Sequence, residues 1–147
     1  MSIKDEASTG DLLNRLLSTH TESELSACIQ EHTISDSKRS FASLFQEMIS
    51  EKHLSRAEII RHSLIDRTYA YQLLSGTRIP GRDKILALGI SAGLSLKEIQ
   101  RLLEYSELGI LYPKSARDAI LIYGIEHHLD VMKINELLEA HQQPCIP

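Results

Sequence analysis

Residues 54–78 have the sequence LSRAEIIRHSLIDRTYAYQLLSGTR, which predicts two short helices joined by a tight turn. A Ser-x-x-Glu capping box opens the first helix, an aspartate caps the second, and a glycine ends it. These signals are Ser55 with Glu58, Asp66 and Gly76. We therefore expect one helix to end near His62 and the next to run from Arg67 to about Ser75.

Further helices are predicted on both sides of this pair. A helix near Ser40 is indicated by apolar residues at helical spacing, namely Phe41, Leu44, Phe45, Met48 and Ile49. Downstream, one helix should span about 82–92 and another should run from the capping box at Ser95 to about Tyr105. Nothing in the chain alternates as a strand would, so the fold class we expect is all-α.

The chain contains an internal repeat. Moving residues 82–104 forward by 35 positions places them on 117–139, and eleven of the 23 positions are identical. The identical pairs include Arg82/Arg117, Asp83/Asp118, Gly89/Gly124, Leu94/Leu129 and Ile99/Ile134. A period of this length is typical of stacked helical hairpins. We expect a second hairpin, broken near Leu129, to pack on the helices before it.

The N-terminal part is predicted to form an appendage of two amphipathic helices. The first begins near Asp11 and the second at a capping box formed by Thr21 and Glu24. Their apolar residues are Leu12, Leu13, Leu16, Leu17, Leu25, Cys28 and Ile29. Left bare, the leucines would make an exposed apolar patch, so we expect this helix to dock on its own core or on another chain.

These patterns divide the chain into four parts. Residues 1–34 are the helical appendage, with a role in interactions, and residues 35–40 are a linker. Residues 41–106 form the core, and residues 107–147 form a helical hairpin that packs on it.

The charges are unevenly distributed along a chain whose net charge is −4. Residues 52–84 carry seven basic residues against three acids, whereas residues 1–34 carry two against six and residues 95–147 five against eight. A concentration of basic residues is the electrostatic footprint of a nucleic-acid interface, although a merely solvated face is the alternative. We expect Arg56, Arg67, Arg78 and Arg82 to form one continuous positive patch.

Several classes of protein are disfavoured. The first ten residues lack the apolar stretch of a signal peptide, and no apolar run approaches the ~20 residues of a membrane span. Two cysteines, Cys28 and Cys145, make no disulfide framework, so we expect a reduced cytoplasmic protein without membrane contact.

There is no Gly-rich phosphate loop, Ser/His/Asp arrangement or zinc-ribbon motif. His127, His128 and His141 with Cys145 suit a zinc site poorly, since adjacent histidines diverge on a helix. We expect no enzyme, metal or cofactor.

The core segment resembles the phage-repressor-like (Xre-type) helix-turn-helix family over residues 54–95. The residues that carry the resemblance are Leu54, Ser55, Glu58, Ile59, Asp66, Arg67, Thr68, Leu73, Gly76, Arg78, Pro80, Ile85, Leu86, Leu88, Gly93, Leu94 and Ser95. The resemblance implies a DNA-binding core whose recognition helix, about Arg67 to Ser75, enters the major groove. It also implies homodimers on palindromic sites.

The resemblance assigns roles to eight residues. Arg67 and Thr68 lie on the first turn of the recognition helix, where arginine can bond guanine and threonine can touch thymine. Tyr71 and Gln72 follow one turn later. Phosphate contacts are implied for Arg56, Ser75, Thr77 and Arg78. Of Tyr69 and Tyr71, we expect one to be buried and the other, Tyr71, to be exposed.

Two features depart from the family pattern. The family usually has alanine where this chain has Ile60, and a bulky residue where this chain has Ala70. The two positions face each other in that fold, so the exchange conserves volume. The family also has glycine in the turn, where this chain has Leu64. A leucine whose backbone is in the left-handed region destabilises the fold by roughly 1 kcal/mol or more, so the turn is either rebuilt or strained.

Two functions are consistent with these observations. The first is a sequence-specific, DNA-binding regulator of transcription whose acidic flanks mediate self-association or bind a protein. The alternative is an interaction adaptor that keeps the fold and has lost specific DNA binding. The basic residues around the recognition helix favour the first function, and the modest overall charge and Leu64 favour the second.

Overall fold

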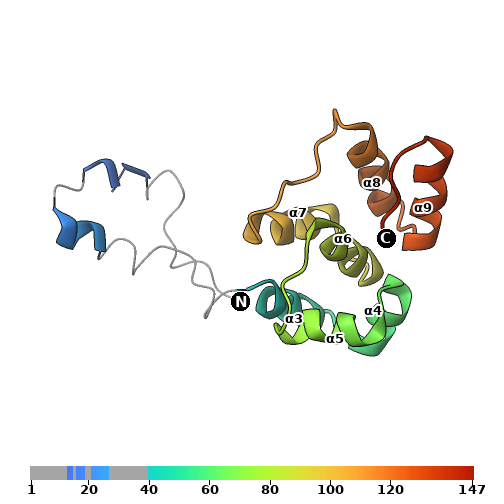
Figure 1. The fold of residues 1–147 in the computed structure, drawn as a ribbon, viewed down its shortest axis with the longest axis horizontal. Helices are drawn as coiled ribbons and strands as arrows, with labels where there is room; N and C mark the ends of the chain where they lie inside the picture. The colour runs from blue at the N-terminus through green and yellow to red at the C-terminus, as the bar shows by residue number, and fades with distance from the viewer. Residues whose placement is uncertain (1–12, 15, 19–20, 27–39) are drawn as a thin grey trace. The chain divides into compact units, whose positions relative to one another are not determined.

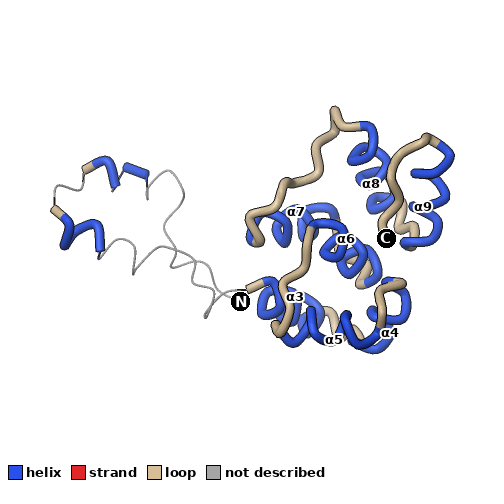
Figure 2. The backbone as a smooth tube through the Cα atoms, in the orientation of Figure 1, coloured by secondary structure: helices blue, strands red, loops and turns tan. Residues whose placement is uncertain are grey.

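The computed structural model describes residues 13–14, 16–18, 21–26 and 40–147, and these residues fall into two compact units divided after Arg39. All regular structure in the described residues is helical, and none of them forms a strand (Figure 2). The predicted all-α class is therefore confirmed. Among the described residues, no helix has the length and apolar character needed to cross a membrane.

In the first unit, the described residues form short helical stretches. The backbone N–H of Glu24 donates to Thr21 Oγ1 at 3.1 Å, as the predicted cap requires. The leucines are exposed, namely Leu13, Leu16, Leu17 and Leu25. The predictions for Leu12, Cys28, Ile29 and residues 35–39 lie outside the described residues. A partner that covers the leucines stays a prediction.

The second unit contains seven helices in residues 40–147. They are α3 (Phe41–Glu51), α4 (Arg56–Ser63), α5 (Arg67–Ser75), α6 (Arg82–Ser91), α7 (Leu96–Tyr105), α8 (Ala116–Glu126) and α9 (Val131–Ala140). Two predicted caps are present: Asp66 caps α5, and a complete capping box of Ser95 and Glu98 opens α7. Only half of the predicted box at the start of α4 forms, since Ser55 accepts the N–H of Glu58 while the Glu58 carboxylate pairs with Arg61. Ser40 caps α3. Local sequence signals therefore set these helix boundaries.

Helix α6 lies at the centre of the second unit. It packs against α4 and α7, and α3 packs against α5 and α7 (Figure 1). In the second hairpin, α9 contacts α6 and α8 contacts α7. Four consecutive α6 residues, Ile85 to Leu88, are fully buried. Because four consecutive residues point to all sides of a helix, this apolar segment is stable only when other helices surround it.

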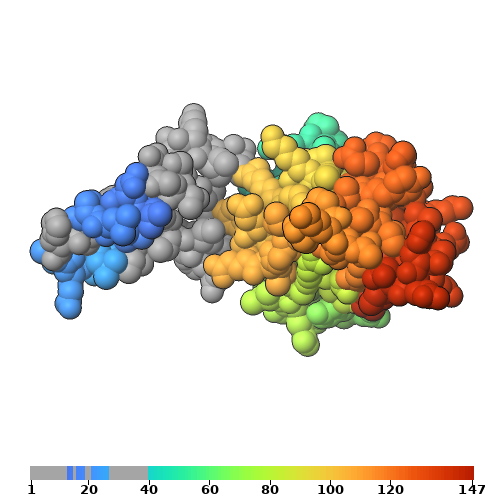
Figure 3. All heavy atoms as spheres, turned by 90° about the horizontal axis from the view of Figure 1, so that it is seen from above, coloured from blue at the N-terminus to red at the C-terminus, as the bar shows by residue number. Residues whose placement is uncertain are grey.

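The second hairpin repeats the first. Helix α8 ends at Glu126 and α9 begins at Val131, which are the positions reached by adding 35 to the end of α6 and the start of α7. The predicted break near Leu129 is thus confirmed. In both hairpins a glycine lets the two helices approach closely: Gly89 lies against Ile99, and Gly124 lies against Ile134. On the face drawn in Figure 3, residues 106–126 (orange) lie beside the C-terminal residues (red).

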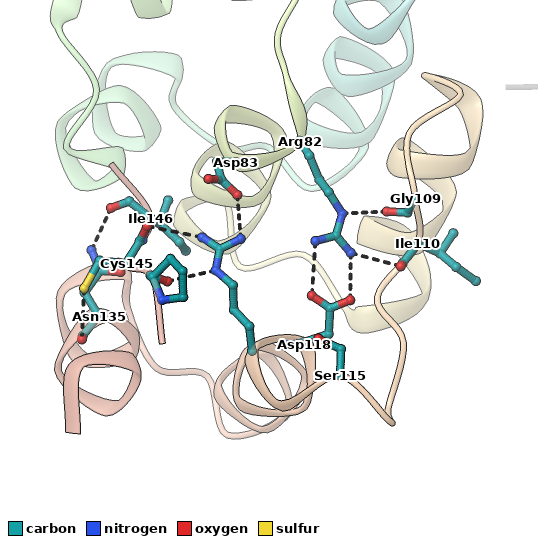
Figure 4. A network of polar contacts seen from close by, with 11 residues as sticks. Arg82, Asp83, Gly109, Ile110, Ser115, Asp118, Asn135, Cys145 and Ile146 are labelled. Atoms are coloured by element: carbon teal, nitrogen blue, oxygen red, sulfur yellow. Dashed lines mark hydrogen bonds and ion pairs between the residues drawn. The ribbon is translucent and has the colours of Figure 1, made fainter. Parts of the chain in front are cut away.

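The repeat continues beyond the residues that are identical in sequence. The side chain of Gln100 bonds both backbone groups of Leu111. The side chain of Asn135 bonds both backbone groups of Ile146 in the same way, and Figure 4 shows where these two residues lie. Each partner lies 35 residues after its counterpart. An amide side chain thus fixes the loop that follows each hairpin. The first copy of the repeat therefore extends to residue 112, and the second copy extends to residue 147.

Candidate nucleic-acid interface

The turn between α4 and α5 has a left-handed leucine. Leu64 ends α4 with φ 63° and ψ 13°, and its side chain is half exposed. The buried hydroxyl of Ser63 donates to the carbonyl of Ile60 at 2.7 Å and accepts from the N–H of Ile65 at 3.2 Å. The turn therefore keeps its left-handed residue and tolerates the strain, because Ser63 bonds the backbone on both sides of it.

Helix α5 presents its first turn to solvent. Asp66 Oδ2 accepts the N–H of Tyr69 at 3.1 Å and so fixes the start of the helix. Arg67 and Thr68 are exposed on the first turn. The opposite face carries buried residues, namely Ala70, Leu73 and Leu74. Ile60, which the resemblance pairs with Ala70, is buried as well.

The prediction for the two tyrosines of α5 is wrong. Tyr69 and Tyr71 are both half buried, rather than one buried and one exposed. The physical reason is that each ring packs against the edge of the core and is also approached by a cation. Lys84 Nζ lies 5.9 Å from the centroid of the Tyr69 ring.

Two arginines meet at Tyr71. The guanidinium carbon of Arg56, on the first turn of α4, lies 5.9 Å from the centroid of the Tyr71 ring, and that of Arg67 lies 5.8 Å from it. Such cation–π contacts restrain both side chains. Tyr71 and Arg67 also border a hollow of about 460 Å³ with an apolar floor that includes Ile60 and Ile65. We call Arg56, Arg67 and Tyr71 the arginine–tyrosine cluster.

Glu58 modifies the charge at the rim of this hollow. Its carboxylate pairs with Arg61 and lies 3.5 Å from His62 Nε2. The hydrogen bond from Arg61 and the charge of that guanidinium lower the pKa of Glu58 from its ordinary value. Glu58 therefore stays ionised and offsets the charge of Arg61. The arginine–tyrosine cluster differs, since neither of its arginines forms an ion pair with any described residue.

The loop after α5 holds the remaining candidate residues. Ser75 Oγ lies 2.9 Å from Thr77 Oγ1 and donates to the carbonyl of Gln72 at 3.1 Å. The N–H of Arg78 donates to the same carbonyl at 3.2 Å. Gly76 makes this bend possible with φ 86°. Ser75, Thr77 and Arg78 are exposed, and Gln72 is half buried at the base of the loop.

Arg82 does not belong to a positive patch, and this part of the prediction is wrong. Its guanidinium forms an ion pair with Asp118 and donates to the carbonyls of Gly109 and Ile110 (Figure 4). These partners lie 27 to 36 residues further along the chain. A local count of charges could not detect them, and the side chain is fixed between the hairpins.

Within the part of the chain that the structure describes, no group of three or more His, Cys, Asp or Glu side chains could hold a metal ion. The centroid of the His127 ring instead lies 4.2 Å from that of the Tyr123 ring.

No protein-family model matches the chain, and neither the curated proteins nor the solved structures contain a match.

Proposed function

We propose that this chain is a sequence-specific, DNA-binding regulator of transcription. In this proposal α4, the turn at Leu64 and α5 act as a helix-turn-helix of the phage-repressor-like kind, with α5 in the major groove. The observation that carries the proposal is the arginine–tyrosine cluster. It holds two guanidinium groups, one from the start of α4 and one from the start of α5, beside the Tyr71 ring, and neither is paired with a described acid.

The exposed first turn of α5 has the chemistry needed to recognise bases. Arg67 can donate two hydrogen bonds to guanine, and Thr68 can contact an adjacent base. The Tyr71 ring restrains the Arg67 side chain before DNA binds, so less conformational entropy is lost on binding. Gln72, half buried one turn later, can bond adenine.

The flanking groups have the chemistry needed to hold the DNA backbone. Arg56 and Arg78 can neutralise phosphates, and the hydroxyls of Ser75 and Thr77 can donate to phosphate oxygens. The bonds that Gln72 makes to this loop keep its polar groups in a fixed arrangement. Contacts of this kind set the register of a protein on DNA, and the bases then determine the sequence preference.

We extend the proposal to assembly by the resemblance. A homodimer would bind a palindromic site with half-sites about one helical turn apart. The acidic N-terminal residues would then mediate self-association or bind a protein, while α5 contacts DNA.

The proposal is tested by selecting sites for the full chain from random DNA duplexes. We expect one sequence to be enriched and to bind at least ~1,000-fold more tightly than a scrambled duplex at physiological salt. The variant Arg56→Ala/Arg67→Ala should lose this enrichment. The variant Lys114→Ala/Lys133→Ala, which removes the same charge from exposed sites outside the cluster, should keep it. Equal affinity of the unaltered chain for all duplexes would contradict the proposal and favour the interaction adaptor.

A further inference from the structure

A second surface, distinct from the candidate nucleic-acid interface, lies between α8 and α9. It is a groove of about 390 Å³ lined by Ala119, Ile120, Tyr123, Leu137 and His141. We call it the α8–α9 groove. Its walls are mostly apolar, and Tyr123 is 53% exposed to solvent. An apolar hollow of this kind on a surface marks a site for binding.

The repeat reveals what covers the same face on the first hairpin. Subtracting 35 from the groove residues gives Lys84, Ile85, Leu88, Leu102 and Ser106. The three apolar residues of that set are fully buried, at 0% exposure. On the first hairpin α4 packs against α6, and α3 packs against α7. The face that is covered by helices in the first hairpin is open in the second.

We infer that the α8–α9 groove binds an amphipathic helix from a partner protein. In the second hairpin, the positions equivalent to the buried Ile85, Leu88 and Leu102 also carry apolar side chains. They are Ile120, Tyr123 and Leu137. A groove of this shape is filled by a helix that buries one apolar stripe and leaves its other face in water. The chemistry of the occupant is therefore that of an amphipathic helix with an apolar edge.

Helix α4 indicates more closely what such an occupant contains. It is eight residues long, and its buried side includes two consecutive isoleucines, Ile59 and Ile60. Its exposed residues include Glu58, Arg61 and His62. We expect the partner helix to present branched apolar residues to the groove, with charged residues only on its solvent side.

Electrostatics separate this site from the proposed DNA site. The groove is lined by no Lys, Arg, Asp or Glu, so binding there should change little with salt. Binding of DNA should weaken steeply as salt rises. The two proposals can therefore fail independently, since each has its own ligand and its own salt dependence.

The experiment uses a library of helical peptides built on residues 55–63 of this chain, in which the apolar positions are varied. The full, unaltered chain is the only target of the selection. We expect a selected peptide to bind the unaltered chain with micromolar affinity and the Tyr123→Glu variant at least tenfold more weakly. Met132→Glu is the matched control, because Met132 is an exposed residue of α9 outside the groove.

Each outcome is decisive. Loss of binding for Tyr123→Glu but not for Met132→Glu, with both variants melting at the temperature of the unaltered chain, supports the site. A library that yields no binder specific for the unaltered chain overturns it. Self-association of the chain that is abolished by Tyr123→Glu, measured by sedimentation, also overturns it, because the occupant would then be a second copy.

Discussion

Arg82 and Asp118 form an ion pair, 2.8 Å between Nη2 and Oδ2, that joins the first helical hairpin to the second. The equivalent residues 35 positions away form the reverse pair, with Arg117 Nη1 2.9 Å from Asp83 Oδ1. A contact in which each repeat gives the same residues to the other is isologous, and it implies approximate twofold symmetry between the hairpins. Such packing is closed, so it does not continue as a solenoid would.

The Arg82–Asp118 pair should contribute strongly to stability. Asp118 is largely buried and also accepts the N–H of Tyr112 at 2.9 Å. Breaking a buried pair leaves an uncompensated charge, so Asp118→Asn should lower the free energy of unfolding by about 3 kcal/mol at pH 7. Asp83→Asn is the control at the equivalent pair, where the carboxylate is 33% exposed, and should cost about 1 kcal/mol or less. Equal losses in urea titrations of the two variants would contradict this account.

The effect of Asp118 should depend on pH. Burial raises the pKa of Asp118, but the hydrogen bonds from Arg82 and Tyr112 outweigh burial and hold it below the ordinary value of 3.8. A lowered pKa stabilises the fold above pH 3.8, and this contribution is lost as the pH falls through the folded value. The difference between the unaltered chain and Asp118→Asn should therefore be constant from pH 5 to 7 and shrink below about pH 4. A difference that grew on acidification would refute the assignment.

Gly124 allows α8 and α9 to touch. A Cβ atom at this position would lie 2.5 Å from Ile134 Cγ1, which is well inside van der Waals contact. Gly124→Ala should thus destabilise the fold by about 1–3 kcal/mol through overpacking. Shortening the neighbour should relieve the clash, so Gly124→Ala/Ile134→Ala should lose less than the sum of the two single variants. Gly81→Ala is the control, as no atom lies within 4 Å of the added Cβ.

Leu64 is a position where the chain can be stabilised. Its backbone is left-handed and its side chain is 54% exposed, so a glycine would relieve strain and lose little burial. We expect Leu64→Gly to raise the free energy of unfolding by about 0.5–1 kcal/mol. Leu64→Ala keeps the Cβ and the strain, and it should give no gain. A thermal melt distinguishes the two, and a gain for alanine alone would show that the side chain, not the backbone, is strained.

Much of the fold could be predicted because its signals are local. The caps at Asp66 and at Ser95 with Glu98 satisfy backbone groups within three residues, so short patterns reveal them. The repeat was visible for a similar reason, since the residues that pack each hairpin are retained. Its continuation to Leu111 and Ile146 was not visible, because the loops that follow the hairpins are held through their backbone groups, which are the same whatever residue stands there.

The candidate site was less predictable, because its geometry depends on distant partners. Arg82 has the charge of an interface residue, but its role is decided by Asp118 and by two carbonyls beyond α7. Tyr71 was expected to be exposed, since its pattern in α5 says nothing of Arg56 on α4. Side chains that interact across elements are thus the part of a site that sequence patterns indicate least well.

Base contacts and phosphate contacts should respond differently to substitution. On the selected duplex, Arg67→Ala should lose ~1–3 kcal/mol of binding free energy and relax the preference at one base pair, with a much smaller effect on scrambled DNA. Arg67→Lys should lose nearly as much, because lysine keeps the charge but not the paired donors. Arg78→Ala should weaken binding to every duplex alike and lower the salt slope by about one unit, as expected for one lost phosphate contact. The measurement is a titration of each variant on both duplexes at several salt concentrations, with Lys133→Ala as the charge-matched control. If Arg67→Ala and Arg78→Ala lost affinity equally on both duplexes, Arg67 would be a phosphate contact, and the base contacts would have to come from Thr68 or Gln72.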